Sequence, residues 1–111
     1  NAERVPAITP RELQRRLSGA ERIVIVDVRE PWEWALGTIA APDVRRIALG
    51  DLPSRWRELD PADEIVLVCH AGVRSAMALD FLRRAGFSRL RNLTGGTDAW
   101  SDEVDPSLPK Y

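Results

Sequence analysis

Residues 66–75 read VLVCHAGVRS and decide how the rest of the chain is interpreted. An apolar run typical of a buried strand ends at Cys69, the only cysteine, and a short loop containing Gly72 follows it. From residue 75 to residue 85 apolar side chains recur at helical spacing, which predicts a helix. The segment therefore predicts a strand, a loop and a helix in direct succession.

Residues 69–75, called the cysteine loop below, have a composition that suits an anion. Backbone N–H groups at the start of a helix carry partial positive charge, and Arg74 adds a full charge beside them. A thiolate is such an anion, and it is the nucleophilic form of cysteine. The pattern favours Cys69 as a nucleophile.

A lone cysteine at the end of a buried strand is most often a small core residue, so its neighbours decide the interpretation. Gly72 permits unusual backbone angles, and an arginine at a helix start opposes the helix dipole unless an anion compensates it. These neighbours favour chemistry over packing at Cys69.

Two further motifs accompany the cysteine loop, namely Asp27-Val28-Arg29-Glu30 and Gly95-Gly96-Thr97-Asp98-Ala99-Trp100. With these three ordered motifs, the chain resembles the rhodanese-like sulfurtransferases over nearly its whole length. The resemblance implies that Cys69 takes a sulfane sulfur from a donor, holds it as a persulfide and passes it to a nucleophilic acceptor.

The cysteine loop would bind the substrate in this interpretation. Its amides could stabilise a persulfide anion, and Arg74 could attract a small anionic sulfur donor such as thiosulfate. The predicted substrate-binding residues are His70, Ala71, Gly72, Val73, Arg74 and Ser75.

Asp27 and Arg29 have a predicted supporting role, and His70, within the loop, has a predicted outward orientation. Asp27 and Arg29 follow a predicted strand, so they should lie at the same sheet edge as Cys69, where they are expected to brace the scaffold. His70 adjoins the nucleophile, but adjacent side chains rarely point together. We expect His70 to face outward toward substrates or a partner protein rather than act as a base.

Two other function classes compete with the sulfurtransferase interpretation. Phosphatases and arsenate reductases of a related fold place five residues between cysteine and arginine, whereas here Cys69 and Arg74 enclose four. A shorter loop should be too tight for a phosphoryl group. A rhodanese-like module that binds a partner without turning over sulfur is the remaining alternative, and the presence of Cys69 argues against it.

Composition limits the remaining possibilities. The chain has 111 residues, 44% of them hydrophobic, and a net charge of −1, which suits one α/β domain over 1–111 and not a nucleic-acid-binding protein. No apolar run is long enough to cross a membrane. A single reactive thiol suits a reducing, cytoplasmic compartment. The sequence gives no indication of a cofactor or a metal.

The chain begins at Asn1 rather than at methionine, so we expect a domain excised from a longer protein. Its ending, residues 105–111, resembles that of bacterial proteins that join an adenylyltransferase domain to a C-terminal rhodanese domain. That resemblance implies a linked adenylyltransferase, a sulfur-carrier protein with a Gly-Gly tail as acceptor, and a cysteine desulfurase as a possible donor. The pathways would be molybdopterin, thiamine or thiolated tRNA synthesis.

Alternating strands and helices predict a mostly parallel five-stranded sheet with helices on both faces. The expected strands are 7–8, 23–28, 44–49, 65–68 and 90–93, and the expected helices begin at Pro10, Pro31, Leu52 and Ser75, with Trp100 on a last helix.

Overall fold

The computed structural model describes residues 5–111. Its strands are β1 (Ala7–Ile8), β2 (Val24–Asp27), β3 (Val44–Arg46), β4 (Ile65–Val68) and β5 (Leu90–Leu93), and its helices are α1 (Pro10–Ser18), α2 (Pro31–Trp34), α3 (Leu52–Arg55), α4 (Val73–Arg84) and α5 (Gly96–Glu103). Short 3-10 turns, Leu49–Asp51 and Trp56–Glu58, flank α3. The predicted α/β class and element order are confirmed.

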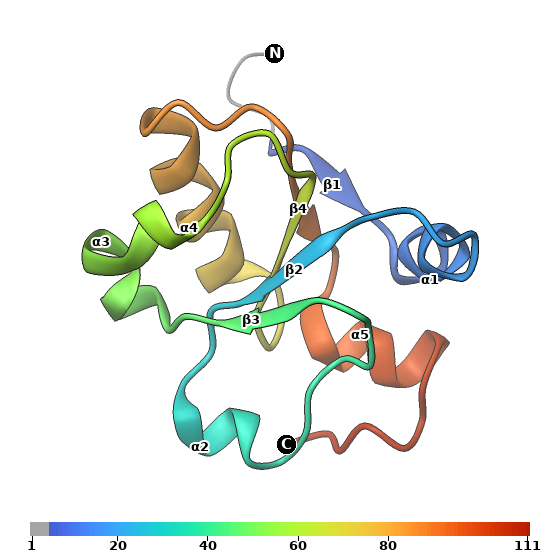
Figure 1. Cartoon of the computed structure of the whole chain (residues 1–111). Coiled ribbons are helices and arrows are strands. Elements are labelled where there is room, and N and C mark those ends of the chain that lie inside the picture. The colour runs from blue at the N-terminus through green and yellow to red at the C-terminus, as the bar shows by residue number, and fades with distance from the viewer. Residues whose placement is uncertain (1–4) are drawn as a thin grey trace.

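The five strands form one sheet in the order β1-β5-β4-β2-β3. Every strand pair is parallel, in agreement with the expected mostly parallel sheet. Figure 1 shows α3 and α4 on one side of the sheet and α1 and α5 on the other. The carboxyl ends of the parallel strands therefore meet at one edge, where ligands bind in open α/β sheets.

The central strands β2 and β4 are buried along their whole length because helices cover both faces. Val26 and Leu67 pack with Leu79 of α4 in one core cluster. Ile25 and Val66 pack with Leu13 of α1 in the other cluster. This double burial explains why the strands are continuous apolar runs rather than alternating ones.

Three predicted elements have different bounds in the structure. The strand expected over 23–28 covers only Val24–Asp27. The strand expected over 44–49 ends at Arg46, because residues 49–51 turn into a 3-10 helix. The helix expected from Ser75 begins at Val73, after Gly72 adopts a φ of 110°. The last residues of the cysteine loop thus form the first turn of α4.

The segment that follows α5 returns to the carboxyl edge of the sheet, and Figure 1 shows it ending beside α2. Leu108 is buried in the core, and its carbonyl oxygen accepts a hydrogen bond of 2.7 Å from the Ser101 hydroxyl. This anchor places Tyr111 close to the cysteine loop.

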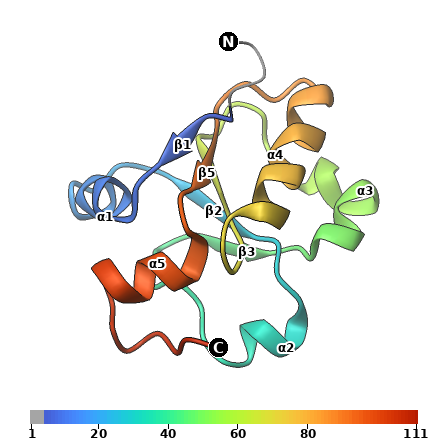
Figure 2. The ribbon, with the colours of Figure 1, turned by 180° about the vertical axis from the view of Figure 1, so that it is seen from behind.

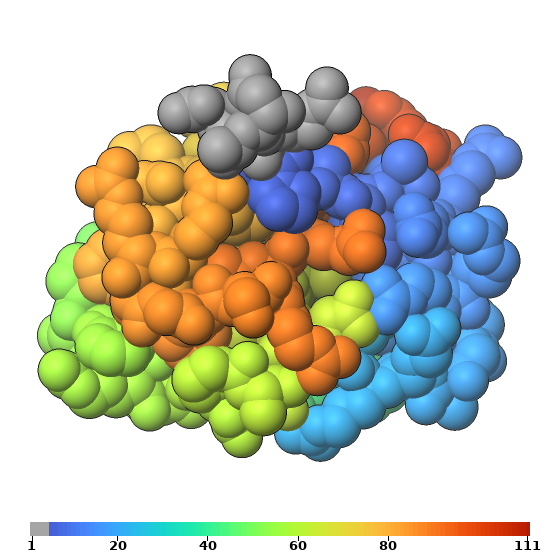
Figure 3. Space-filling view, turned by 90° about the horizontal axis from the view of Figure 1, so that it is seen from above, coloured from blue at the N-terminus to red at the C-terminus, as the bar shows by residue number. Residues whose placement is uncertain are grey.

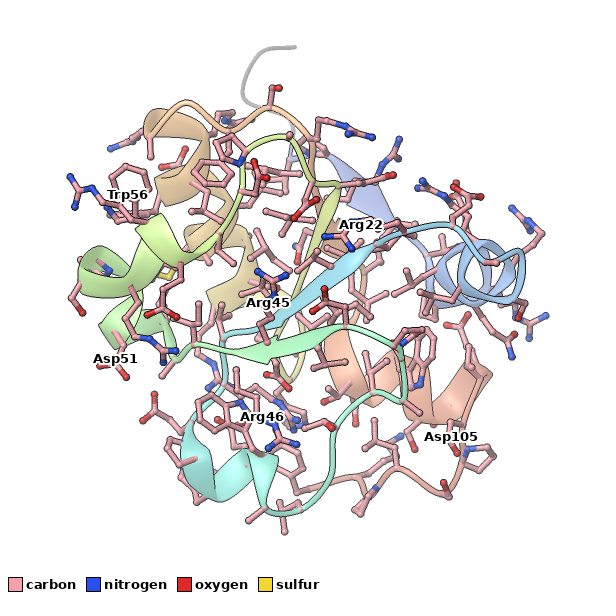
Figure 4. All side chains as sticks on the ribbon, in the orientation of Figure 1. Arg22, Arg45, Arg46, Asp51, Trp56 and Asp105 are labelled. Carbon is pink, nitrogen blue, oxygen red and sulfur yellow. The ribbon has the colours of Figure 1, made fainter. Side chains whose placement is uncertain are left out.

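The opposite edge of the sheet carries the turns that precede the strands. Figure 3 shows this edge, with the segments before β2 (blue), β4 (yellow-green) and β5 (orange) gathered on it. Arg22 and Arg45 lie along β2 and β3 (Figure 4), and they pair with Asp63 and Asp43 at 3.3 and 3.0 Å. Much of the arginine content therefore serves surface ion pairs, which add little stability individually.

Candidate functional site

Cys69 follows the last residue of β4 at the carboxyl edge of the sheet. In Figure 2 the starts of α4 (yellow) and α5 gather there with α2. The Cys69 Sγ atom is buried, accepts a hydrogen bond of 3.1 Å from the Gly72 amide, and lies 3.2 Å from the Ser75 Oγ atom. The sulfur thus sits inside its own loop, where polar groups face it from two directions.

Asn92 of β5 links both of these sulfur contacts. The Ser75 hydroxyl donates a hydrogen bond of 2.5 Å to Asn92 Oδ1, and Asn92 Nδ2 donates one of 3.1 Å to the Gly72 carbonyl. In this arrangement the hydroxyl oxygen can accept from a Cys69 thiol, and it must rotate to donate to a thiolate. Asn92 was not among the predicted site residues, although an asparagine near the carboxyl end of the last predicted strand was a signal.

Ser75→Ala is expected to slow alkylation of Cys69 by iodoacetamide about tenfold, because the thiolate loses the hydrogen bond that the rotated Ser75 hydroxyl would donate to it. The rate would be measured by intact mass at constant pH. Ser54→Ala is the matched control, since the Ser54 hydroxyl only donates to the Asp51 carbonyl on an exposed turn. Equal rates for the two variants would contradict a role for Ser75 at the sulfur.

The start of α5 holds the cysteine loop by its backbone. The Thr97 and Asp98 amides donate to the carbonyls of Cys69 and His70 at 2.9 and 3.1 Å. Gly95 and Gly96 precede these amides with φ values of 74° and 61°. The glycine pair found in the sequence therefore gives α5 close access to the cysteine.

Arg74 has a different immediate partner from the one that the sequence suggested. Its guanidinium forms two hydrogen bonds to the Glu33 carboxylate, at 2.6 and 2.9 Å. Glu33 is only 2% exposed, and its pKa falls to about 2, mainly because Arg74 binds it. An anionic donor would therefore meet an ion pair instead of a free cation.

The structure places Asp27 and Arg29 in a buried pair below the loop. The Arg29 guanidinium binds the Asp27 carboxylate at 2.8 Å and the Gly37 carbonyl at 2.7 Å, and it donates to the Tyr111 hydroxyl at 3.1 Å. All of these contacts are with the scaffold. The bracing role expected of the pair stays a prediction, and these contacts are its structural basis.

Tyr111 joins the cysteine loop to α2. Its ring stacks on the His70 ring with centroids 4.1 Å apart, and its hydroxyl donates to Glu33 at 2.5 Å. His70 Nε2 lies 3.8 Å from an Asp98 carboxylate oxygen. Sequence analysis missed Glu33 and Tyr111 as members of this network, because their partners are distant in the chain.

Within residues 5–111, no group of three or more His, Cys, Asp or Glu side chains is arranged to hold a metal ion. None of the helices in the described part of the chain is both long and apolar enough to cross a membrane.

Residues 9–103 match the family described as the Rhodanese-like domain. The chain belongs to this family. The rhodanese-like domain is 35% identical over 97 residues to a sulfurtransferase of Allochromatium vinosum, with 87% of this chain and 89% of that protein covered. It also superposes on the crystal structure of a rhodanese-like domain protein from Staphylococcus aureus, with a TM-score of 0.82, 32% identity, and 96% and 99% of the two chains covered.

One relative is longer than this chain, and its name gives an adenylyltransferase activity beside the sulfurtransferase activity. The rhodanese-like domain is 36% identical over 104 residues to the probable adenylyltransferase/sulfurtransferase MoeZ of Mycobacterium tuberculosis. The match covers 94% of this chain but 26% of MoeZ, so the chain spans about a quarter of that relative. Two of these relatives, from Allochromatium vinosum and Mycobacterium tuberculosis, are named as sulfurtransferases.

Proposed function

We propose that the rhodanese-like domain carries sulfane sulfur as a persulfide on Cys69. The observation that carries this proposal is the position of Sγ inside its own loop, between the Gly72 amide and the Ser75 hydroxyl. The Gly72 amide donates to the sulfur, and the Ser75 hydroxyl can rotate away from Asn92 to donate as well, so both groups can stabilise an anionic sulfur without a general base. The His70 ring stacks on Tyr111, but its side chain is still 31% exposed. We therefore assign it to contacts with a donor or acceptor protein.

The transfer proceeds in two displacements with thiosulfate as donor. The Cys69 thiolate attacks the outer sulfur of thiosulfate, a new S–S bond forms, and the S–S bond of the donor breaks to release sulfite. An acceptor nucleophile then attacks the outer sulfur of the persulfide and restores the thiolate. Cyanide would leave as thiocyanate in this second step, and a thiol acceptor would leave as its persulfide. An adenylated Gly-Gly tail would react in the opposite sense, because the outer sulfur of the persulfide attacks its acyl carbon and AMP leaves. Two equivalents of a thiol would then reduce the resulting acyl disulfide, releasing the thiocarboxylate and the Cys69 thiol.

In the cell the acceptor proposed here is a sulfur-carrier protein with a Gly-Gly tail, and the donor is thiosulfate or the persulfide of a cysteine desulfurase. The similarity to MoeZ supports this choice, because the name of that relative joins an adenylyltransferase to a sulfurtransferase. The same similarity motivates the proposal of a covalently linked adenylyltransferase domain and a role in molybdopterin synthesis. Chemistry on a free thiol suits the cytoplasm.

Intact mass after treatment with thiosulfate, and then with cyanide, tests the proposal. The protein is expected to gain the mass of one sulfur atom and to lose it to cyanide, whereas Cys69→Ser gains nothing. If thiosulfate gives no gain, a cysteine desulfurase with cysteine is the second donor to try. Failure with both donors would reject the persulfide carrier and leave the partner-binding module, and hydrolysis of an aryl phosphate would instead indicate a phosphatase.

A further inference from the structure

The ion pair beside the cysteine loop affects which sulfur donors the site can use. Arg74 is the cation nearest in sequence to Cys69, and both of its hydrogen bonds to Glu33 are short. Because Glu33 is buried and also receives the Glu30 amide and the Tyr111 hydroxyl, its carboxylate is fixed in place. The charge of Arg74 is therefore compensated before a donor arrives.

Two further cations near the loop, Arg29 and Lys110, are paired in the same way. Arg29 is bound by Asp27, and Lys110 lies 2.8 Å from Asp102 and 3.8 Å from Asp98. Asp98 also faces His70. A dianion such as thiosulfate thus meets three cations, Arg74, Arg29 and Lys110, that are each already paired with a carboxylate, whereas attraction over distance requires a net positive field.

Exposed apolar side chains surround the same loop. Val73, within the loop, is 71% exposed, and Met77, one turn further along α4, is 58% exposed. Trp32 is 62% exposed and contacts Tyr111 edge to face, with centroids 5.7 Å apart. Because Tyr111 stacks on His70, an aromatic row extends from α2 to the loop. Such a surface favours an organic donor over a strongly hydrated inorganic dianion.

We propose that Glu33 is a specificity-determining residue, which compensates Arg74 so that the site prefers weakly charged organic sulfur donors, such as a cysteine persulfide, over thiosulfate. This inference rests on the persulfide function proposed for Cys69. In each case the thiolate of Cys69 attacks the outer sulfur of the donor, and the leaving group is sulfite from thiosulfate or a thiolate from an organic persulfide.

A matched pair of donors isolates the effect of charge. Thiosulfate is a dianion, methanethiosulfonate is a monoanion, and both transfer an outer sulfur to Cys69, releasing sulfite and methanesulfinate respectively. Loading rates would be measured by intact mass for the wild type and Glu33→Gln. For each protein the thiosulfate rate is divided by the methanethiosulfonate rate. The intrinsic reactivity of each donor is the same for both proteins, so it cancels when the two ratios are compared.

Glu33→Gln leaves the charge of Arg74 uncompensated, so the thiosulfate-to-methanethiosulfonate ratio is expected to rise about tenfold at low ionic strength and to fall back as salt is added. Glu103→Gln removes the same charge from the exposed end of α5, where Glu103 only faces Arg11 at 3.7 Å, and should leave the ratio unchanged. The double variant Glu33→Gln/Arg74→Gln removes both charges and should restore the wild-type ratio.

If Glu33 had only a structural role, Glu33→Gln would load sulfur more slowly from both donors and the ratio of the two rates would stay unchanged. That result would overturn the inference. The wild type provides an independent test that needs no variant to fold. The rate at which thiosulfate loads the wild type should depend only weakly on ionic strength. A steep decrease of this rate with added salt would show that the Arg74 charge is uncompensated, and it would also overturn the inference. Failure of the wild type to load from thiosulfate, methanethiosulfonate and a desulfurase would instead reject the proposed function itself.

Discussion

Gly96→Ala is expected to lower the free energy of unfolding by about 3 kcal/mol or more and to abolish sulfur loading of Cys69. An added Cβ would lie 2.3 Å from the Cys69 carbonyl oxygen and 2.4 Å from that of His70. Both neighbours are backbone atoms, and both carbonyls accept hydrogen bonds from α5. Relief of the clash must therefore separate α5 from the cysteine loop, and the whole domain has only about 5–15 kcal/mol of stability to lose.

Gly86→Ala is the control that separates the steric clash expected in Gly96→Ala from the strain of placing alanine at a positive φ. Gly86 has a φ of 102°, also unfavourable for alanine, but an added Cβ there meets no atom within 4 Å. We expect this control to lose about 1 kcal/mol and to load sulfur normally. Chemical denaturation and intact mass after donor treatment provide the two measurements. Similar behaviour of the two variants would mean that the approach of α5 does not determine the geometry of the cysteine loop.

Much of the fold could be predicted from the sequence because its signals are local. The apolar runs that became β2 and β4 are short, bounded by turns and separated by helical patterns, which is enough to predict a parallel α/β sheet. The position of Cys69 at the carboxyl edge follows from that topology. The helix start was misplaced because the positive φ of Gly72 allows α4 to begin directly after it.

The partners of the loop residues were harder to predict because they are distant in the sequence. Glu33 lies 41 positions before Arg74, and Tyr111 lies 78 positions after Glu33. A glutamate on a short helix reads as a solvated residue, and only the return of the segment after α5 brings Tyr111 to it. The charge of Arg74 therefore looked available in the sequence but is compensated in the fold.

Arg74→Met is expected to destabilise the domain by about 3 kcal/mol at pH 7 while keeping a side chain of similar length. The variant leaves the buried Glu33 carboxylate with the Glu30 amide and the Tyr111 hydroxyl, but without a positive charge. Arg84→Met is the matched control. Arg84 is 81% exposed and pairs with Asp80 at 3.1 Å on the surface of α4, so its loss should change stability by less than about 0.5 kcal/mol.

The pH dependence identifies Glu33 as the cause of this destabilisation. In the wild type the pKa of Glu33 falls from 4.5 to about 2, mainly through the hydrogen bonds from Arg74. That stabilisation, about 3 kcal/mol, is fully present above pH 4.5 and is lost as the pH falls toward 2. In Arg74→Met the pKa of Glu33 should be higher than in the wild type, because the main group that lowers it is gone while burial still raises it. The variant carboxylate should therefore be protonated at a higher pH, and the wild type should lose its advantage as the pH falls. Urea denaturation between pH 7 and 3 should show the two stabilities converging, and a gap independent of pH would exclude the Glu33 carboxylate as its origin.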